Sequence, residues 1–137
     1  MQAFKFIIAL TIFSSFSYGN PVETGHAKVS LVKFDTSLSA KNELFIGIKM
    51  DMQKNWHTYW KNPGDSGGPI KVIWNLPENV TIEGPLWPTP ELLPYSPLMT
   101  YGYTDFVIFP FKVSYTDISN LTFIGADIDF LICDDVC

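Results

Sequence analysis

The fold class of this chain is decided by the stretch Leu44-Phe45-Ile46-Gly47-Ile48-Lys49-Met50-Asp51-Met52. Its leucine, isoleucines and methionines occupy every second position, and the residues between them fall on the other face. A period of two is typical of a β-strand that buries one face and exposes the other. The stretch therefore predicts a half-buried strand over residues 44–52.

The same alternation extends through much of the chain. Residues 107–115 and 124–130 repeat it, and residues 29–34 and 70–74 are shorter strand candidates. Pro110 inside the first of these predicts a sheet edge or a bulge, because proline cannot donate a ladder hydrogen bond. Proline and glycine interrupt every window of helical length. We therefore expect an all-β domain, and short strands with this spacing favour a two-sheet antiparallel sandwich over a barrel.

The N-terminus has the layout of a secretory signal peptide. Lys5 precedes an apolar run over residues 6–13, and the small residues Ser17 and Gly19 suit cleavage before Asn20. The run is shorter than the roughly 20 apolar residues of a membrane-spanning helix. We therefore expect a signal peptide over residues 1–19 and an exported domain over residues 20–137, in a compartment where disulfides persist.

The charge of the exported part narrows the choice of partners. Without Lys5 it has 8 lysines, no arginine and 14 acidic residues, a net charge of −6. Such a surface argues against nucleic acid and against an anionic membrane as partners. A length of 118 residues is enough for one domain and too short for two.

Two long stretches, residues 56–69 and 84–103, have no strand pattern and are rich in tryptophan and tyrosine. We expect irregular loops there. Loops of this length in a compact domain are usually functional, and their aromatic content argues against disorder. The alternative is that these rings close the open ends of the sandwich as ordinary core material.

The first of these stretches contains Gly64-Asp65-Ser66-Gly67-Gly68-Pro69, the nucleophile signature of chymotrypsin-like serine proteases, with His57 upstream. That mechanism requires a histidine held by a buried aspartate and brought to the serine from a separate part of a two-barrel fold. One domain of this size cannot supply it. We interpret the cluster as a tight surface loop.

Both cysteines lie at the C-terminus, in Cys133-Asp134-Asp135-Val136-Cys137. Extended backbone would place their Cα atoms about 13 Å apart, whereas a helical turn gives about 6 Å, within the limit for a disulfide. We therefore expect the last strand to end near Cys133 and the chain to turn. A disulfide that closes so short a loop gains only about 2 kcal/mol, which favours a redox role over a structural one.

Two other interpretations of the cysteines remain open. An exported binding module could carry a purely structural disulfide, with the aromatic loops contacting a protein or a glycan. A copper site would need two histidines together with a cysteine, and His26 and His57 show no recognisable ligand spacing. We therefore expect no metal and no cofactor.

The motifs together resemble a known family. They are W-H-T-Y-W-x-N-P-G-D-S-G-x-P over residues 56–69, W-P-x-P over 87–90, Y-G-Y over 101–103 and the C-terminal C-x-x-x-C. This combination is similar to the periplasmic N-terminal domain of DsbD/ScsB-type thiol:disulfide interchange proteins. The tryptophan usual just before the first cysteine in that family is replaced here by Phe130 and Leu131.

The resemblance implies an immunoglobulin-like sandwich that acts as a thiol:disulfide oxidoreductase of the protein-disulfide reductase type. Cys133 and Cys137 would be its catalytic pair, reduced by a membrane-embedded electron-donating domain and passing reducing equivalents to periplasmic thiol-disulfide proteins. In relatives the chain continues into membrane segments, so we expect this sequence to be a fragment or a stand-alone version.

Several neighbours of the pair are candidates for shielding or tuning it. We expect Tyr101 and Tyr103 to cover the cysteines, with residues 56–60 as the alternative cover. His57 could influence thiol ionisation if it lies close. Asp134 and Asp135 should disfavour the thiolate, which suits an electron donor better than an oxidant.

Overall fold

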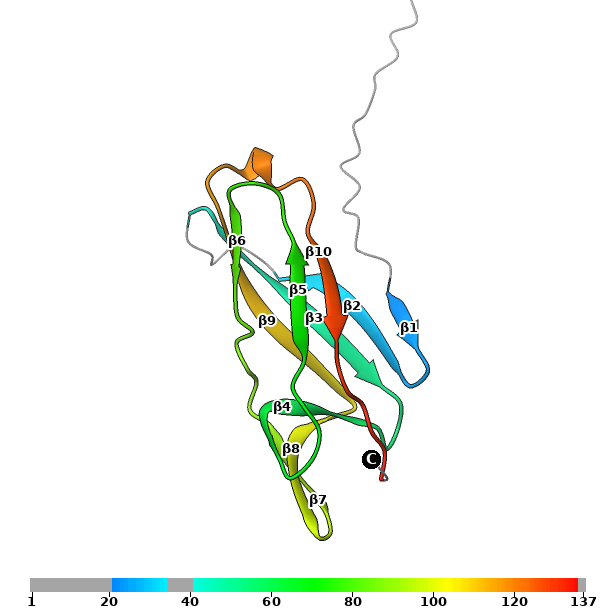
Figure 1. Ribbon diagram of the computed structural model, residues 1–137. Helices are drawn as coiled ribbons and strands as arrows, with labels where there is room; N and C mark the ends of the chain where they lie inside the picture. Colours follow the sequence, from blue (N-terminus) through cyan, green and yellow to red (C-terminus); the bar gives the residue numbers. More distant parts are fainter. Residues whose placement is uncertain (1–20, 35–40, 136–137) are drawn as a thin grey trace, which may run out of the picture.

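The computed structural model describes residues 21–34 and 41–135. Nearly all of its regular structure is β-strand (Figure 1). The strands are β1 (Val22–Thr24), β2 (Ala27–Lys33), β3 (Glu43–Met52), β4 (His57–Gly64), β5 (Lys71–Asn75), β6 (Val80–Glu83), β7 (Glu91–Tyr95), β8 (Leu98–Thr104), β9 (Phe106–Tyr115) and β10 (Gly125–Asp129). A 3-10 helix, η1 (Ile118–Asn120), joins β9 to β10.

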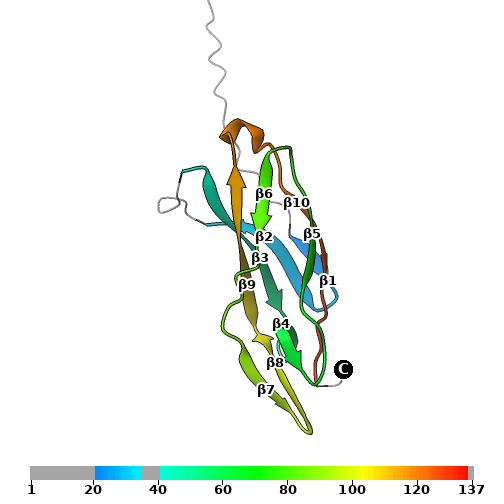
Figure 2. The same cartoon turned by 60° about the vertical axis from the view of Figure 1, so that its left-hand side comes forward.

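The strands form an antiparallel sandwich. The larger sheet has the order β1-β2-β3-β9-β6. The paired strands β5 and β10 lie over it, and the small sheet β4-β8-β7 extends one end of the molecule (Figures 1 and 2). The expected all-β, immunoglobulin-like architecture is confirmed.

The long pair β3 and β9 forms the centre of the core. Its register places Ile48 opposite Phe109 and Met50 opposite Val107, and the first three of these side chains are completely buried. The period of two in each strand directs alternate residues to this face, as the sequence predicts. Strands β5 and β10 cover the same face, where the Trp74 ring meets Phe111 edge-on with 4.9 Å between centroids.

Pro110 lies at a locally open edge of β9. The pairing with β6 ends at Glu83 and Lys112, two residues before Pro110 is reached. Beyond that point the Pro110 carbonyl accepts a hydrogen bond of 2.8 Å from the Leu86 N–H. The missing donor of proline is tolerated at such an edge.

The two stretches expected to be irregular contain strands, and that expectation was wrong. Residues 57–64 form β4, and residues 91–104 form the hairpin of β7 and β8. The prolines and glycines that suggested loops lie near the strand ends or on open edges: Pro63 comes just before the end of β4, and Pro94 is on the outer strand β7. Tertiary pairing here overrides local propensity.

Candidate functional site

The segment after β10 lies along β4 and is held there by main-chain hydrogen bonds. The His57 N–H donates to the Cys133 carbonyl at 2.8 Å, and the Cys133 N–H donates to the His57 carbonyl at 3.0 Å. The Thr58 hydroxyl donates to the Leu131 carbonyl at 2.9 Å. Strand β10 itself ends at Asp129, so Cys133 is reached after a short break and occupies a single bridge.

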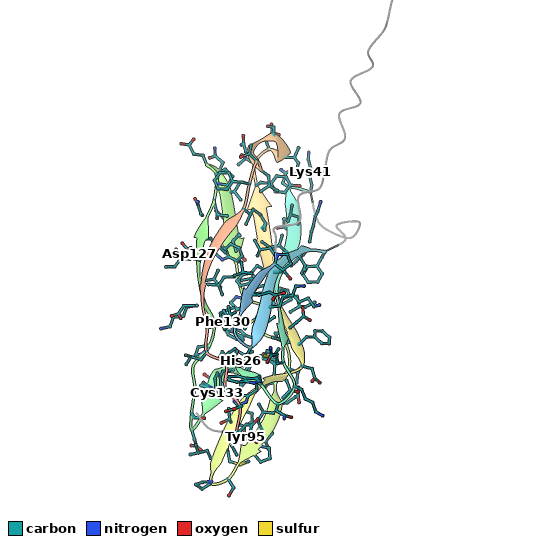
Figure 3. The ribbon with its side chains drawn as sticks, turned by 90° about the vertical axis from the view of Figure 1, so that its right-hand side faces the viewer. His26, Lys41, Tyr95, Asp127, Phe130 and Cys133 are labelled. Carbon is teal, nitrogen blue, oxygen red and sulfur yellow. The ribbon has the colours of Figure 1, made fainter. Side chains whose placement is uncertain are left out.

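Cys133 is disulfide-bonded in the structure. Its expected partner Cys137 lies outside the described residues, as do Val136 and the signal peptide expected over residues 1–19. Cys133 lies at the same end of the molecule as Tyr95 of β7, with Lys41 and Asp127 farther toward the other end (Figure 3). The first cysteine is thus placed by β4 at the end of the sandwich where β7 and β8 lie.

His57 is the buried polar group next to this cysteine. Only 1% of its surface is exposed, and its Nδ1 lies 3.0 Å from the Tyr95 hydroxyl oxygen. The His57 and Tyr95 rings are stacked with 4.7 Å between centroids, and the Tyr59 ring meets His57 edge-on. Burial lowers the pKa of His57, and the negative charges of Asp135 and Asp134 partly oppose that shift. The imidazole is therefore neutral near neutral pH.

A cavity of about 400 Å³ opens beside His57. Ser66 and the tip of the β7–β8 hairpin, residues 95–98, line it on one side, and Asp134 and Asp135 contribute acidic groups. The structure thus brings together three of the predicted residues, His57, Asp134 and Asp135, at a space large enough to admit part of a partner.

The Gly-Asp-Ser loop fixes the hairpin in place. The Asp65 N–H donates to the Met99 carbonyl at 3.0 Å, and the Asp65 carboxylate accepts from the Met99 N–H at 2.9 Å. The hydroxyl oxygens of Ser66 and Thr100 lie 3.0 Å apart. The loop that imitates a protease signature is therefore a clamp between β4 and β8.

The protease interpretation fails on geometry as well as on size. The Ser66 hydroxyl is engaged with Thr100, and the His57 Nδ1 faces a phenol where a triad would place a carboxylate. The site has no Ser-His-Asp arrangement among its described residues.

The two tyrosines expected to cover the cysteines have other neighbours. Tyr103 is 4% exposed, donates its hydroxyl to the Pro88 carbonyl at 2.8 Å and packs edge-on against Phe109. Burial raises the pKa of Tyr103 to about 12. Tyr101 is 40% exposed and lies against the Trp60 ring. Neither lines the cavity, which is bordered by Tyr95 instead.

Sequence reasoning missed Tyr95 and the clamp residue Asp65. Tyr95 lies in an L-P-Y-S-P stretch whose prolines gave no sign of a hairpin strand. A better signal was the pattern around Asp65, because aspartate followed by small residues and glycine commonly caps a neighbouring backbone group.

The described residues were compared with the requirements of a metal site and of a membrane-spanning helix. Within residues 21–34 and 41–135, no group of three or more His, Cys, Asp or Glu side chains is arranged to hold a metal ion. The same part of the chain contains no helix of the length and apolarity needed to cross a bilayer.

Comparison with known protein families shows which family the chain belongs to. Residues 28–137 match the family described as thiol:disulfide interchange protein DsbD, N-terminal. The chain belongs to the DsbD N-terminal family. The resemblance inferred from the tryptophan-rich motifs and the C-terminal cysteines is thereby confirmed, and thiol:disulfide interchange is the general activity of this family.

A solved structure supports the fold of this DsbD N-terminal domain. The N-terminal periplasmic domain of ScsB from Proteus mirabilis superposes with a TM-score of 0.57 at 23% sequence identity. The match covers 83% of this chain and 43% of that one, so the chain spans less than half the length of the ScsB domain. No protein of curated function matches the sequence.

Proposed function

We propose that this chain is an exported thiol:disulfide interchange domain in which Cys133 and Cys137 form the redox-active pair. It would act as a protein-disulfide reductase, passing reducing equivalents to periplasmic thiol-disulfide proteins. Its electron donor would be a membrane-embedded domain, part of the same polypeptide in full-length relatives. Neither nucleic acid nor a cofactor is required.

The observation that carries the proposal is the placement of Cys133. Two main-chain hydrogen bonds hold it against His57 at an end of the sandwich, and His57 and the next residue, Asp134, line an open cavity. A disulfide that served only stability would gain most by joining distant strands. Here membership of the interchange family and a cysteine whose neighbours line an open cavity point to the same chemistry.

The chemistry is thiol–disulfide exchange. A partner thiolate attacks one sulfur of the Cys133–Cys137 disulfide, a mixed disulfide forms, and the released thiolate takes up a proton. A second partner thiolate then resolves the mixed disulfide. In the opposite direction one of the two cysteines attacks a partner disulfide and the other releases the reduced partner.

Shielding of the pair is better assigned to the hairpin tip than to Tyr101 and Tyr103. Residues 95–98 border the cavity together with Asp134 and Asp135, whereas Tyr103 is buried against Phe109. A cover on a hairpin tip is accessible to a docking partner and can be displaced by it, because loop tips are the most mobile parts of a domain.

A redox titration tests the proposed function. The mature domain is equilibrated with glutathione or dithiothreitol buffers, and the fraction of free thiol is measured by alkylation. We expect one two-electron transition at potentials typical of exported exchange proteins, above about −300 mV. Cys133→Ser and Cys137→Ser serve as controls, since neither can form the pair and neither should show the transition.

A pair that stays oxidised well below about −300 mV would identify a structural disulfide. In that case the domain is an immunoglobulin-like binding module, and its exposed aromatic and aliphatic side chains around β7 and β8 become the surface to test. A transition in the expected range with no reaction toward any thioredoxin-like protein would also contradict interchange.

A further inference from the structure

The pairing of His57 with Cys133 fixes the relation of their side chains. In an antiparallel ladder, two directly opposed residues project their side chains from the same face, with Cα atoms about 5.5 Å apart when they exchange both hydrogen bonds. His57 and Cys133 exchange both bonds. The imidazole and the sulfur are therefore cross-strand neighbours, although 76 positions separate them in the sequence.

The contact with Tyr95 engages one of the two ring nitrogens of His57. Nδ1 lies 3.0 Å from the Tyr95 hydroxyl oxygen, whereas Nε2 makes no hydrogen bond to any described residue. When Nδ1 carries the hydrogen and donates it to Tyr95, the lone pair of Nε2 is free to accept a proton. His57 is also one of the residues that line the cavity, together with Asp134, the residue that follows Cys133.

The charged groups around the ring favour a transient imidazolium. Asp134 and Asp135 on the C-terminal segment act electrostatically on His57, and no lysine lines the cavity. Among the described residues, the other ionisable groups in ring contact with His57 are phenols: Tyr95 from β7 and Tyr59 from its own strand. The pKa of each of these tyrosines is raised, mainly by burial, so both stay neutral over the pH range of exchange.

We propose that His57, oriented by Tyr95, is the proton acceptor and donor for the Cys133 sulfur during exchange. The inference rests on the proposed function of the cysteine pair. It assigns a role in proton transfer to His57 and a positioning role to Tyr95, which the sequence did not single out.

The proton balance is the same whichever cysteine attacks the partner. When Cys133 forms a disulfide, its S–H bond breaks, the proton moves to His57 Nε2 and the thiolate attacks a disulfide sulfur. That S–S bond breaks, and its electron pair leaves on the other sulfur, which takes the proton back from Nε2 or from water. In the reverse direction the imidazolium protonates the Cys133 thiolate as it leaves the disulfide.

The acidic surroundings make such a base useful. A cysteine with the ordinary pKa of about 8.5 is only a few per cent ionised at pH 7, and neighbouring carboxylates reduce that fraction. A neutral imidazole that takes the proton from the thiol lets Cys133 react although its ionised fraction at equilibrium is small. The same carboxylates then stabilise the imidazolium that forms, so that no isolated charge is left next to the buried ring.

The test isolates one sulfur. In Cys137→Ser, the only remaining thiol is Cys133, whose reaction with 4,4′-dithiodipyridine is followed by absorbance from pH 5.5 to 10. Adding His57→Gln should slow the reaction about tenfold at pH 7, because without a base only a few per cent of the thiol is ionised. Above about pH 9.5 the two rates should converge, because the thiol then ionises without a base.

Tyr95→Phe is the second variant and keeps the stacked ring. We expect a loss of about fivefold at pH 7, the size of one neutral hydrogen bond, which also disappears at high pH. The controls are His26→Gln, the other histidine, which is exposed and stacked on Trp56, and Tyr115→Phe at the far end of β9. Both should match the parent at every pH.

Each outcome is decisive. Equal rates in parent and variants, or a deficit that persists to pH 10 in a folded variant, overturn the role of His57. If His57→Gln does not fold, Tyr95→Phe alone decides. The assay measures one thiol and needs no intact pair, so it can succeed when the redox titration fails. A normal redox transition with an unchanged pH profile would retain the proposed function and reject the proton transfer.

Discussion

Two regions of this sandwich, its β3–β9 centre and the end formed by β4, β7 and β8, are built in different ways. Around β3 and β9 the buried side chains are apolar, and Ile48, Met50, Phe109 and Val113 are completely inaccessible. At the end formed by β4, β7 and β8 the buried set includes polar side chains, His57, Thr58 and Thr100, while aliphatic Leu98 and Met99 are more than 40% exposed. Apolar and polar groups have partly exchanged their usual places there.

This difference separates stability from reactivity. The β3–β9 region buries large apolar side chains, and burial of this kind is the main favourable term in folding. The β4–β8–β7 end is fixed by directed hydrogen bonds, from Asp65 to Met99 and from His57 to Cys133. Directed bonds can hold a reactive group in place while leaving apolar surface exposed for a partner.

The largest expected effect comes from the core. Phe109→Ala removes a completely buried ring in contact with Trp87 and Tyr103, and should lower the free energy of unfolding by about 3–5 kcal/mol. Urea unfolding measures it. The matched control is Phe106→Ala on the same strand, whose ring is 59% exposed and whose loss should cost within about 0.5 kcal/mol. Similar losses for the two variants would contradict the view that the buried apolar side chains of the β3–β9 region supply its stability.

A smaller effect on stability is expected in the loop of residues 64–67, which clamps β4 to the β7–β8 hairpin. Gly67 has φ +86°, and a Cβ there would collide with the Tyr59 ring. Gly67→Ala should therefore cost about 1–3 kcal/mol and displace Tyr59 from its contact with His57. Thermal unfolding measures the first effect, and the rate of Cys133 modification in the Cys137→Ser background measures the second.

Gly25→Ala is the control for this substitution, because its new Cβ would meet nothing within 4 Å. We expect that variant to match the parent in both measurements. A Gly67→Ala domain that is destabilised but retains the reactivity of Cys133 would show that the loop supports the hairpin without influencing the cysteine.

The smallest effect is the pH dependence of stability. Burial lowers the pKa of His57 from its ordinary 6.5, so the unfolded chain binds the proton more readily than the folded one. The contribution of neutral His57 is fully present above pH 6.5 and decreases as the pH falls through 6.5 toward the lowered value. Unfolding free energies measured from pH 8 to pH 5 should decline less in His57→Gln than in the parent, whereas His26→Gln should follow the parent.

The sequence predicts the β3–β9 region well and the cysteine-bearing end less well. Long strands with one buried face carry a strict period of two, which is why residues 44–52 and 107–115 were located almost to the residue. The strands of the other end are short, contain Pro63 and Pro94, and bury polar residues such as His57. Their pairing depends on partners distant in sequence, which no local pattern contains.

The candidate site was anticipated in part for the same reason. Asp134 and Asp135 follow Cys133 directly in the chain, so their proximity needed no structure. The proximity of His57 depends on one bridge between β4 and the C-terminal segment, and that of Tyr95 depends on a hairpin hidden by prolines. For Tyr103 the local sequence does not distinguish a core position from a cover, because an aromatic ring next to glycine suits both.

The bridge between His57 and Cys133 uses only peptide groups, and this has a consequence for how such domains can diversify. Any residue at position 57 other than proline can supply the same N–H and C=O. The position of Cys133 therefore does not depend on which side chain faces it. If His57 carries the proton as we propose, substitutions at position 57 would change the speed and the pH range of exchange while the sulfur stays in place. Evolution can thus adjust the chemistry of the site without rebuilding the fold that presents it.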